Sequence, residues 1–154
     1  MRKRTPLYLN SLEDAKKKGR EEVDKYLASY KANVRCAEDI KRTIYYYYDG
    51  FRLPDGFENR VLDTYGLERM SYVLAYNIQH MPYDGRISEE NKKWAAQIKT
   101  TQNGEAFRSE YMVDAHVGLL NMFINAIREH QLAQEADLKT NYTNEEDHGM
   151  DMKL

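Results

Sequence analysis

The sequence lacks the features that place a chain in a membrane or an oxidising compartment. It has no run of about 18 apolar residues that could span a bilayer. Lys16-Lys17-Lys18 interrupts the N-terminal region in which a signal peptide would need its apolar segment. The single cysteine, Cys36, excludes an internal disulfide and argues against a structural zinc site. We therefore expect a soluble, intracellular protein in which Cys36 is a small buried hydrophobic residue.

The signatures of known catalytic sites are also missing. The chain has no phosphate-binding glycine-rich loop, no Gly-x-Ser-x-Gly, no His-Glu-x-x-His and no Cys-x-x-Cys. Its four histidines are scattered at positions 80, 116, 130 and 148, without the spacing of metal ligands. We therefore predict no metal and no cofactor, and a binding protein in preference to an enzyme.

His116 is the one catalytic candidate. It lies in Asp114-Ala115-His116-Val117-Gly118, where we expect a helix to begin and its backbone N–H groups to attract anions. A phosphate contact or a role as general acid or base is one interpretation. The other is a surface histidine that caps the helix locally.

Charge is distributed unevenly along the 154 residues, whose formal net charge is −2. Residues 134–154 contain six acids and two lysines, which leaves 21 bases and 19 acids in the rest of the chain. This balance is far from that of a histone, so nonspecific duplex binding is not expected. The tail also has too little apolar surface to offset its ordering entropy, so we expect a helical domain over 1–133 and an acidic disordered tail over 134–154.

Periodicity predicts a mainly α-helical, compact single domain of about five or six helices. A short helix capped by Asn10 or Ser11 should end at Gly19, and the longest helix should run from Glu21 to Asp49-Gly50. Further helices are expected from Pro54 or Asp55 to Gly66, over 67–79, from Ser88 through Ile98, and from an Asp114 cap to about Gln134. Residues 99–106 should form a loop, and residues 107–113 a short strand or extended connector.

Four consecutive tyrosines, Tyr45 to Tyr48, end the longest predicted helix. Successive helical residues are offset by about 100°, so no single face can bury all four rings. Tyr47 or Tyr48 can complete the apolar stripe, whereas Tyr45 and Tyr46 should lie at its margins with wet hydroxyls. A ring left exposed suits a partner, because tyrosine is enriched at interface hot spots.

Several basic residues could contact nucleic acid. The candidates are Lys16-Lys17-Lys18-Arg20, Lys41-Arg42, Arg52, Arg69, Arg86 and Lys92-Lys93 beside Trp94. Arginine beside an aromatic ring can hold a phosphate while the ring stacks on an unpaired base. Each has a structural alternative. The Lys16 cluster suits a solvated helix end, and Arg52 and Arg86 each follow a Tyr-Asp-Gly triplet whose aspartate they could pair with.

Five short motifs resemble a domain family of unknown function that is common in bacterial mobile elements, and the likeness covers roughly residues 8–130. The motifs are Lys31-Ala32-Asn33-Val34-x-Cys36, Tyr48-Asp49-Gly50-Phe51-x-Leu53, Gly66-Leu67-Glu68-Arg69 with Val73-Leu74-Ala75-x-Asn77-Ile78-Gln79, Asp84-Gly85-Arg86-x-Ser88-x-x-Asn91-x-x-Trp94-Ala95, and His116-x-Gly118-Leu119. This chain has Tyr83 where the family more often has tryptophan, and Val117 where it has proline.

Relatives of this kind resemble accessory genes of phages and conjugative elements, and some resemble inhibitors of the type II CRISPR effector nuclease. The resemblance implies an anti-CRISPR protein that binds the effector nuclease or its guide RNA in the cytoplasm of a bacterial host cell and blocks cleavage of target DNA. Its expected contact residues are Tyr45, Tyr46, Arg52, Arg86, Lys92 and Lys93. Two alternatives are an enzyme that cleaves or remodels guide RNA through His116, and an interaction module of a mobile-element protein with no CRISPR role.

Overall fold

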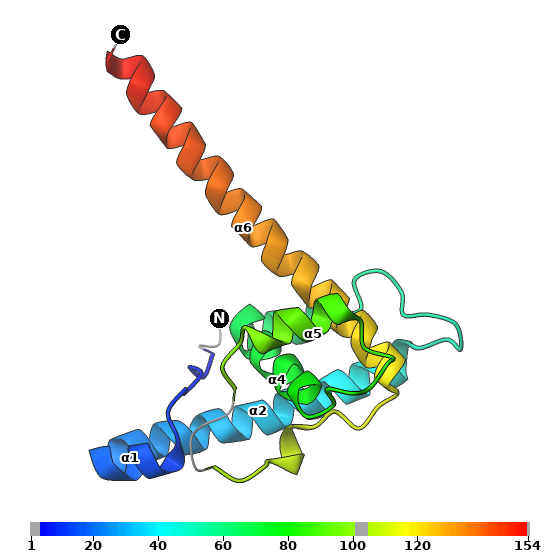
Figure 1. Ribbon diagram of the computed structural model, residues 1–154. Coiled ribbons are helices and arrows are strands. Elements are labelled where there is room, and N and C mark those ends of the chain that lie inside the picture. Colours follow the sequence, from blue (N-terminus) through cyan, green and yellow to red (C-terminus); the bar gives the residue numbers. More distant parts are fainter. Residues whose placement is uncertain (1–3, 101–104, 154) are drawn as a thin grey trace.

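A computed structural model describes residues 4–100 and 105–153, with the backbone alone described for 140–153. In this part of the chain there are six α-helices, one short 3-10 helix and no strand, which confirms the expected mainly helical single domain. The elements are α1 (Leu12–Lys18), α2 (Arg20–Tyr47), α3 (Asn59–Tyr65), α4 (Leu67–Gln79), α5 (Glu89–Ala96), η1 (Ser109–Tyr111) and α6 (Val117–Lys153) (Figure 1).

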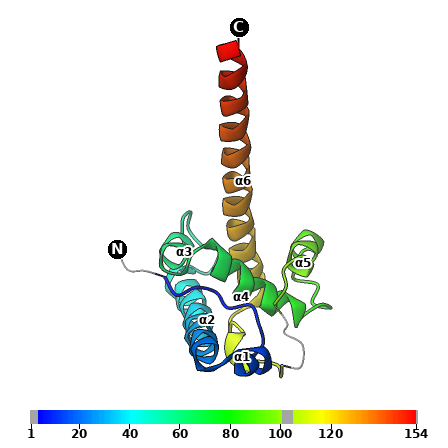
Figure 2. The ribbon, with the colours of Figure 1, turned by 90° about the vertical axis from the view of Figure 1, so that its left-hand side faces the viewer.

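Helix α4 is the centre of the fold. It packs against α2, α3, α5 and α6, and Figure 2 shows it lying between these helices. Met70 and every residue from Tyr72 to Ile78 are buried, so this helix is covered on all sides, as a helix without a polar face must be. The other helices are amphipathic and cover it.

Local chemistry sets most helix ends where the sequence predicts them. The hydroxyl of Ser11 accepts a hydrogen bond from the Asp14 amide at 3.1 Å, and Ser88 caps α5 in the same way through Asn91. Gly19 and Gly66 have φ angles of 121° and 85°, which side chains rarely adopt, and each separates two helices. Helix α3 begins at Asn59, later than the expected Pro54 or Asp55, because turns occupy residues 55–58.

Helix α2 runs unbroken through Asn33. Asn33 is buried and accepts a hydrogen bond from Arg69 of α4, so a polar residue on the inner face is satisfied rather than disruptive. Leu27, by contrast, is 44% exposed although it is apolar. The helix ends at Tyr47, two residues before the expected Asp49-Gly50, and Gly50 has a φ of 101° in the following turn.

Residues 107–113 do not form the short strand that their sequence allows. Ser109–Tyr111 makes a single 3-10 turn, and the neighbouring amides donate to side chains instead of to a partner strand. The Arg108 amide donates to the Tyr76 hydroxyl at 2.8 Å, and the Val113 amide donates to Asn77 Oδ1 at 2.7 Å. Because α4 supplies these acceptors, the segment is paired without a sheet.

Helix α6 begins at Val117 and not at an Asp114 cap, and Asp114 instead pairs with Lys41 of α2 at 3.3 Å. It continues to Lys153, beyond the expected end near Gln134, and projects from the body in both views (Figures 1 and 2). The backbone after Gln134 is thus helical where disorder is expected. Every side chain from Leu132 to Lys139 is exposed, so this part lacks the packing that stabilises most helices. The division into a domain and a separate tail stays a prediction.

Candidate functional site: a basic groove between α2 and α3

The residues predicted as a contact surface lie in two places. Tyr45 and Tyr46 are at the end of α2, followed by Arg52 in the next loop, whereas Arg86 lies between α4 and α5. Lys92 and Lys93 lie on α5. No hydrogen bond or ion pair in the described chain joins the first group to the second.

The fold explains much of the second group. The Arg86 guanidinium holds both carboxylate oxygens of Asp84, with Nε to Oδ1 at 3.0 Å and Nη2 to Oδ2 at 2.7 Å. The Lys92 ammonium pairs with Glu89 at 3.5 Å, and only 19% of its side chain is exposed. Lys93 is exposed and makes no ion pair in the described chain. Arg86 therefore has the structural role that its place after a Tyr-Asp-Gly triplet allows.

We predict that the Asp84 carboxyl titrates with a pKa of about 2, below its ordinary 3.8, because the Arg86 side chain and then the Arg86 amide donate to its charged form. Because the pKa of Asp84 is lower in the folded protein than in the unfolded chain, the Asp84–Arg86 pair stabilises the fold at pH values above the unfolded pKa. This stabilisation is lost as the pH falls through about 2. A carbon-detected NMR titration of the side-chain carboxyl measures the midpoint. Arg86→Ala should raise it, whereas Arg52→Ala, on the other Asp-Gly loop, should leave it unchanged.

The loop after α2 keeps its aromatic and basic side chains outside. Asp49 Oδ1 accepts hydrogen bonds from the amides of Phe51 and Arg52, both at 2.9 Å. These bonds, that from Arg52 first, lower the pKa of the Asp49 carboxyl. The Phe51 ring is 93% exposed, and the Arg52 guanidinium has no hydrogen-bond or ion-pair partner within the described chain.

All four consecutive tyrosines are exposed, more than the sequence predicts. Tyr45 and Tyr46 are 66% and 81% exposed, as expected for the margins of the helix, and Tyr47 and Tyr48 are 38% and 41% exposed, so neither completes the core. The Tyr46 and Tyr47 rings meet edge to face, with centroids 4.9 Å apart. The helix thus ends in a cluster of rings that contributes little to the core.

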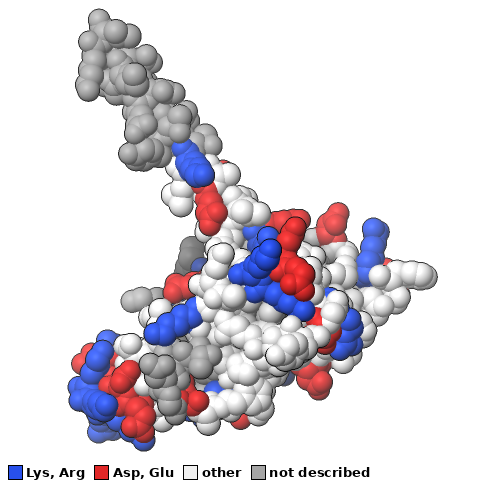
Figure 3. Space-filling view, in the orientation of Figure 1, with Lys and Arg blue, Asp and Glu red and all other residues white. Residues whose placement is uncertain are grey.

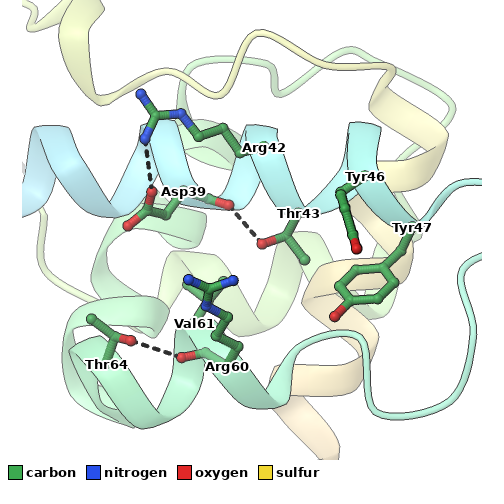
Figure 4. A pocket seen from close by; sticks show the side chains of 8 residues that line it. All are labelled: Asp39, Arg42, Thr43, Tyr46, Tyr47, Arg60, Val61 and Thr64. Atoms are coloured by element: carbon green, nitrogen blue, oxygen red, sulfur yellow. Dashed lines mark hydrogen bonds and ion pairs between the residues drawn. The ribbon is translucent and has the colours of Figure 1, made fainter.

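This cluster closes one end of a groove between α2 and α3, which we call the tyrosine end (Figure 4). Its volume is about 520 Å³. Its lining residues are Asp39, Arg42, Thr43, Tyr46, Tyr47, Arg60, Val61 and Thr64. Figure 4 shows the Arg60 side chain reaching from α3 into the space below α2, while Arg42 turns toward Asp39.

Asp39 is engaged on both of its oxygens. It accepts from the Tyr65 hydroxyl at 2.5 Å and pairs with Arg42 at 3.4 Å. Burial, and then the Asp39 carboxylate beside it, raise the pKa of Tyr65, so the phenol remains a donor at neutral pH. The Arg42 side chain is 75% exposed, and the exposed Arg60 guanidinium has no hydrogen-bond or ion-pair partner in the described chain, so both groups can be reached by an incoming anion.

The groove continues along α2 to a second part, the arginine end, with a volume of about 1060 Å³. Its lining residues are Arg4, Thr5, Ala28, Lys31, Ala32, Arg35, Asp63, Thr64, Tyr65 and Arg69. Thr64 lines both parts, so the two are adjacent, and we call them together the α2–α3 groove. Six basic residues and two acids line it, on a chain whose net charge is −2.

The sequence interpretation missed Lys31, Arg35 and Arg60 as site residues. Lys31, Arg35 and Arg42 recur at spacings of four and seven along α2, which places them on one helix face beside the core stripe. That spacing was a usable signal. Arg60 could not be assigned, because its position depends on how α3 packs against α2.

The Lys16 cluster has a different setting. Figure 3 shows the end of the molecule where α1 lies covered by basic and acidic side chains together. The three lysines form the last turn of α1, where the helix dipole favours positive charge. This surface carries charges of both signs, whereas basic residues outnumber acids six to two in the α2–α3 groove.

His116 caps α6. Its Nδ1 accepts a hydrogen bond from the Gly118 amide at 3.0 Å, within the first turn of the helix. No described carboxylate or hydroxyl hydrogen-bonds to the ring. The local capping interpretation of His116 therefore accounts for its position.

The described residues contain no group of three or more His, Cys, Asp or Glu side chains arranged to hold a metal ion. None of their helices is long and apolar enough to cross a membrane.

Cys36 is fully buried, with its sulfur 3.5 Å from that of Met70, and burial raises the pKa of its thiol. It is the small buried hydrophobic residue that the sequence predicts.

Comparison with known proteins gives a family without an assigned activity. The family model described as "Protein of unknown function (DUF3849)" matches residues 7–132, and the chain belongs to this family. No curated protein matches the chain. No solved structure matches it either.

Proposed function

We propose that this protein binds the type II CRISPR effector nuclease in its guide-RNA-loaded form and blocks cleavage of target DNA. The observation that carries the proposal is the tyrosine end of the α2–α3 groove, where exposed rings and open guanidinium groups meet. The five sequence motifs described above, with their resemblance to inhibitors of this nuclease, supply the identity of the partner.

The side chains of Tyr46 and Arg60 at the tyrosine end contribute little to the stability of the fold. Tyr46 is 81% exposed, and the Arg60 guanidinium has no hydrogen-bond or ion-pair partner in the described chain. Tyrosine and arginine are the residues that most often dominate binding energy, because each combines a large contact area with directional hydrogen bonds. Tyr45, in the last turn of α2, and Arg52, in the loop that follows this helix, are exposed as well. A ribonucleoprotein offers both phosphates and protein to such a surface.

Inhibition of DNA cleavage tests the proposal directly. Purified protein is added to the guide-loaded nuclease, and the rate of target cleavage is measured against protein concentration. We expect Tyr46→Ala and Arg60→Ala each to weaken inhibition by about 30-fold, since losing a hot spot costs about 2 kcal/mol and 1.4 kcal/mol is a factor of ten. Tyr83→Ala is the matched control, because its ring is 97% exposed on the loop between α4 and α5.

The same assay separates the alternatives. A protein that neither binds the loaded nuclease nor slows cleavage would overturn the proposal, and is the outcome expected of an interaction module with no CRISPR role. Guide RNA recovered from each reaction is also sized on a gel. If the parent protein shortens the guide RNA and the His116→Ala variant does not, then inhibition occurs by RNA cleavage and not by binding alone.

A further inference from the structure

A buried arginine without a counter-ion lies at the floor of the arginine end. Arg69 is 3% exposed. Its Nη1 donates to the Ser29 carbonyl at 3.1 Å and to Asn33 Oδ1, and its Nη2 donates to the Thr5 carbonyl at 2.9 Å. Every one of these acceptors is neutral, and no described carboxylate forms an ion pair with Arg69.

The uncompensated charge makes the groove a site for anions. Removing a cation from water is costly unless an opposite charge or several hydrogen bonds replace the solvent, and here only hydrogen bonds do so. Burial accordingly lowers the pKa of Arg69, yet a guanidinium remains protonated in proteins. Arg4, Lys31 and Arg35 line the same part of the groove, and Asp63 is the one acid among the residues that line it. An anion entering here meets a charge that the fold leaves unbalanced.

We infer that the α2–α3 groove binds the phosphodiester backbone of a single-stranded nucleic acid. This inference names the ligand of the site used above and so rests on the proposed function, in which guide RNA is the strand. Lys31 and Arg42 are separated by about 16 Å along α2, from the rise of about 1.5 Å per residue. That length accommodates several consecutive phosphates of an extended strand. Arg60 reaches from α3 into the same groove, in which Arg42 also lies (Figure 4).

The rings at the far end of the groove decide between a single strand and a duplex. Tyr46 and Tyr47 line the groove where the row of basic residues ends, and exposed rings of this kind stack on bases that are not already paired. A duplex keeps its bases stacked inside and offers them no partner. An acidic protein segment could also neutralise the basic row, but it would leave the two rings without a stacking partner.

Fluorescence anisotropy with the full-length protein tests the inference. The probes are a labelled single-stranded RNA of about ten nucleotides, the same sequence as a duplex, and a polyglutamate peptide of equal charge. We expect the single strand to bind most tightly. Four phosphate contacts, by Lys31, Arg35, Arg42 and Arg60, predict a slope of about −2.8 for log Kobs against log salt concentration.

Paired charge variants make the test specific to the groove. Arg35→Gln with Arg60→Gln should weaken binding of the single strand and reduce the slope to about −1.4. The control is Lys17→Gln with Arg20→Gln, which removes the same charge from exposed positions outside the groove and should leave binding unchanged. Far-UV circular dichroism checks that both variants are folded.

Three results would overturn the inference: no binding of the single strand, equal binding of duplex or polyglutamate, or equal losses in the groove and control variants. The nuclease assay keeps this failure apart from failure of the proposed function. Inhibition of cleavage without single-strand binding would leave the proposed function standing and remove the inference. Binding of the single strand by the groove without inhibition of cleavage would remove the proposed function and leave binding of single-stranded nucleic acid standing.

Discussion

Replacing Phe123 by alanine is expected to lower the free energy of unfolding by about 3–5 kcal/mol. The Phe123 side chain on α6 is fully buried, and its ring meets that of Phe57 edge to face with centroids 4.9 Å apart. The variant loses the apolar burial, the ring contact and close packing around the cavity that remains. Total stabilities of domains are about 5–15 kcal/mol, so the loss is a large share. Urea denaturation followed by far-UV circular dichroism measures it.

Phe51→Ala is the matched control, because that ring is 93% exposed and its loss should change stability by less than about 0.5 kcal/mol. Phe57 lies in the turns that precede α3, so the contact with Phe123 also fixes the segment leading into the α3 wall of the groove. Equal effects of the two substitutions would contradict the packing described for α6.

The parts of the fold that the sequence predicted correctly depend on neighbours along the chain. Ser11 and Ser88 cap their helices through amides three residues away, and Gly66 separates two helices because its own backbone adopts a positive φ. Helix α4 was predicted at its observed ends for the same reason. Interactions over three or four residues can be read from spacing alone.

The parts that the sequence did not predict depend on distant partners. Arg60 joins the groove only because α3 packs beside α2, and Arg69 becomes a buried charge only because Thr5 and Ser29 surround it. The segment 107–113 has the composition of a strand, but acceptors on α4 take its amides. Spacing along one helix could have indicated the row of Lys31, Arg35 and Arg42; no local pattern indicates the opposite wall.

Asn77 is the residue through which α4 imposes that structure, and Asn77→Leu is expected to destabilise the protein by about 1–3 kcal/mol for each of two orphaned groups. Asn77 is fully buried. Its Oδ1 accepts from the Val113 amide at 2.7 Å, and its Nδ2 donates to the Tyr111 carbonyl at 2.9 Å. Leucine has a similar volume, but it can neither accept from the Val113 amide nor donate to the Tyr111 carbonyl. Urea denaturation gives the loss, and hydrogen exchange of the Val113 amide should become faster.

Gln97→Leu controls for the exchange of an amide side chain for an apolar one, because Gln97 is exposed and its side chain has no hydrogen bond in the described chain. It should change stability by less than about 0.5 kcal/mol. If Asn77→Leu protein unfolds at the same urea concentration as the parent, with unchanged exchange at Val113, then Asn77 does not hold the segment. The absence of a strand would then need another cause. If the loss is as large as expected, one buried amide accounts for a segment with strand-like composition folding without a sheet.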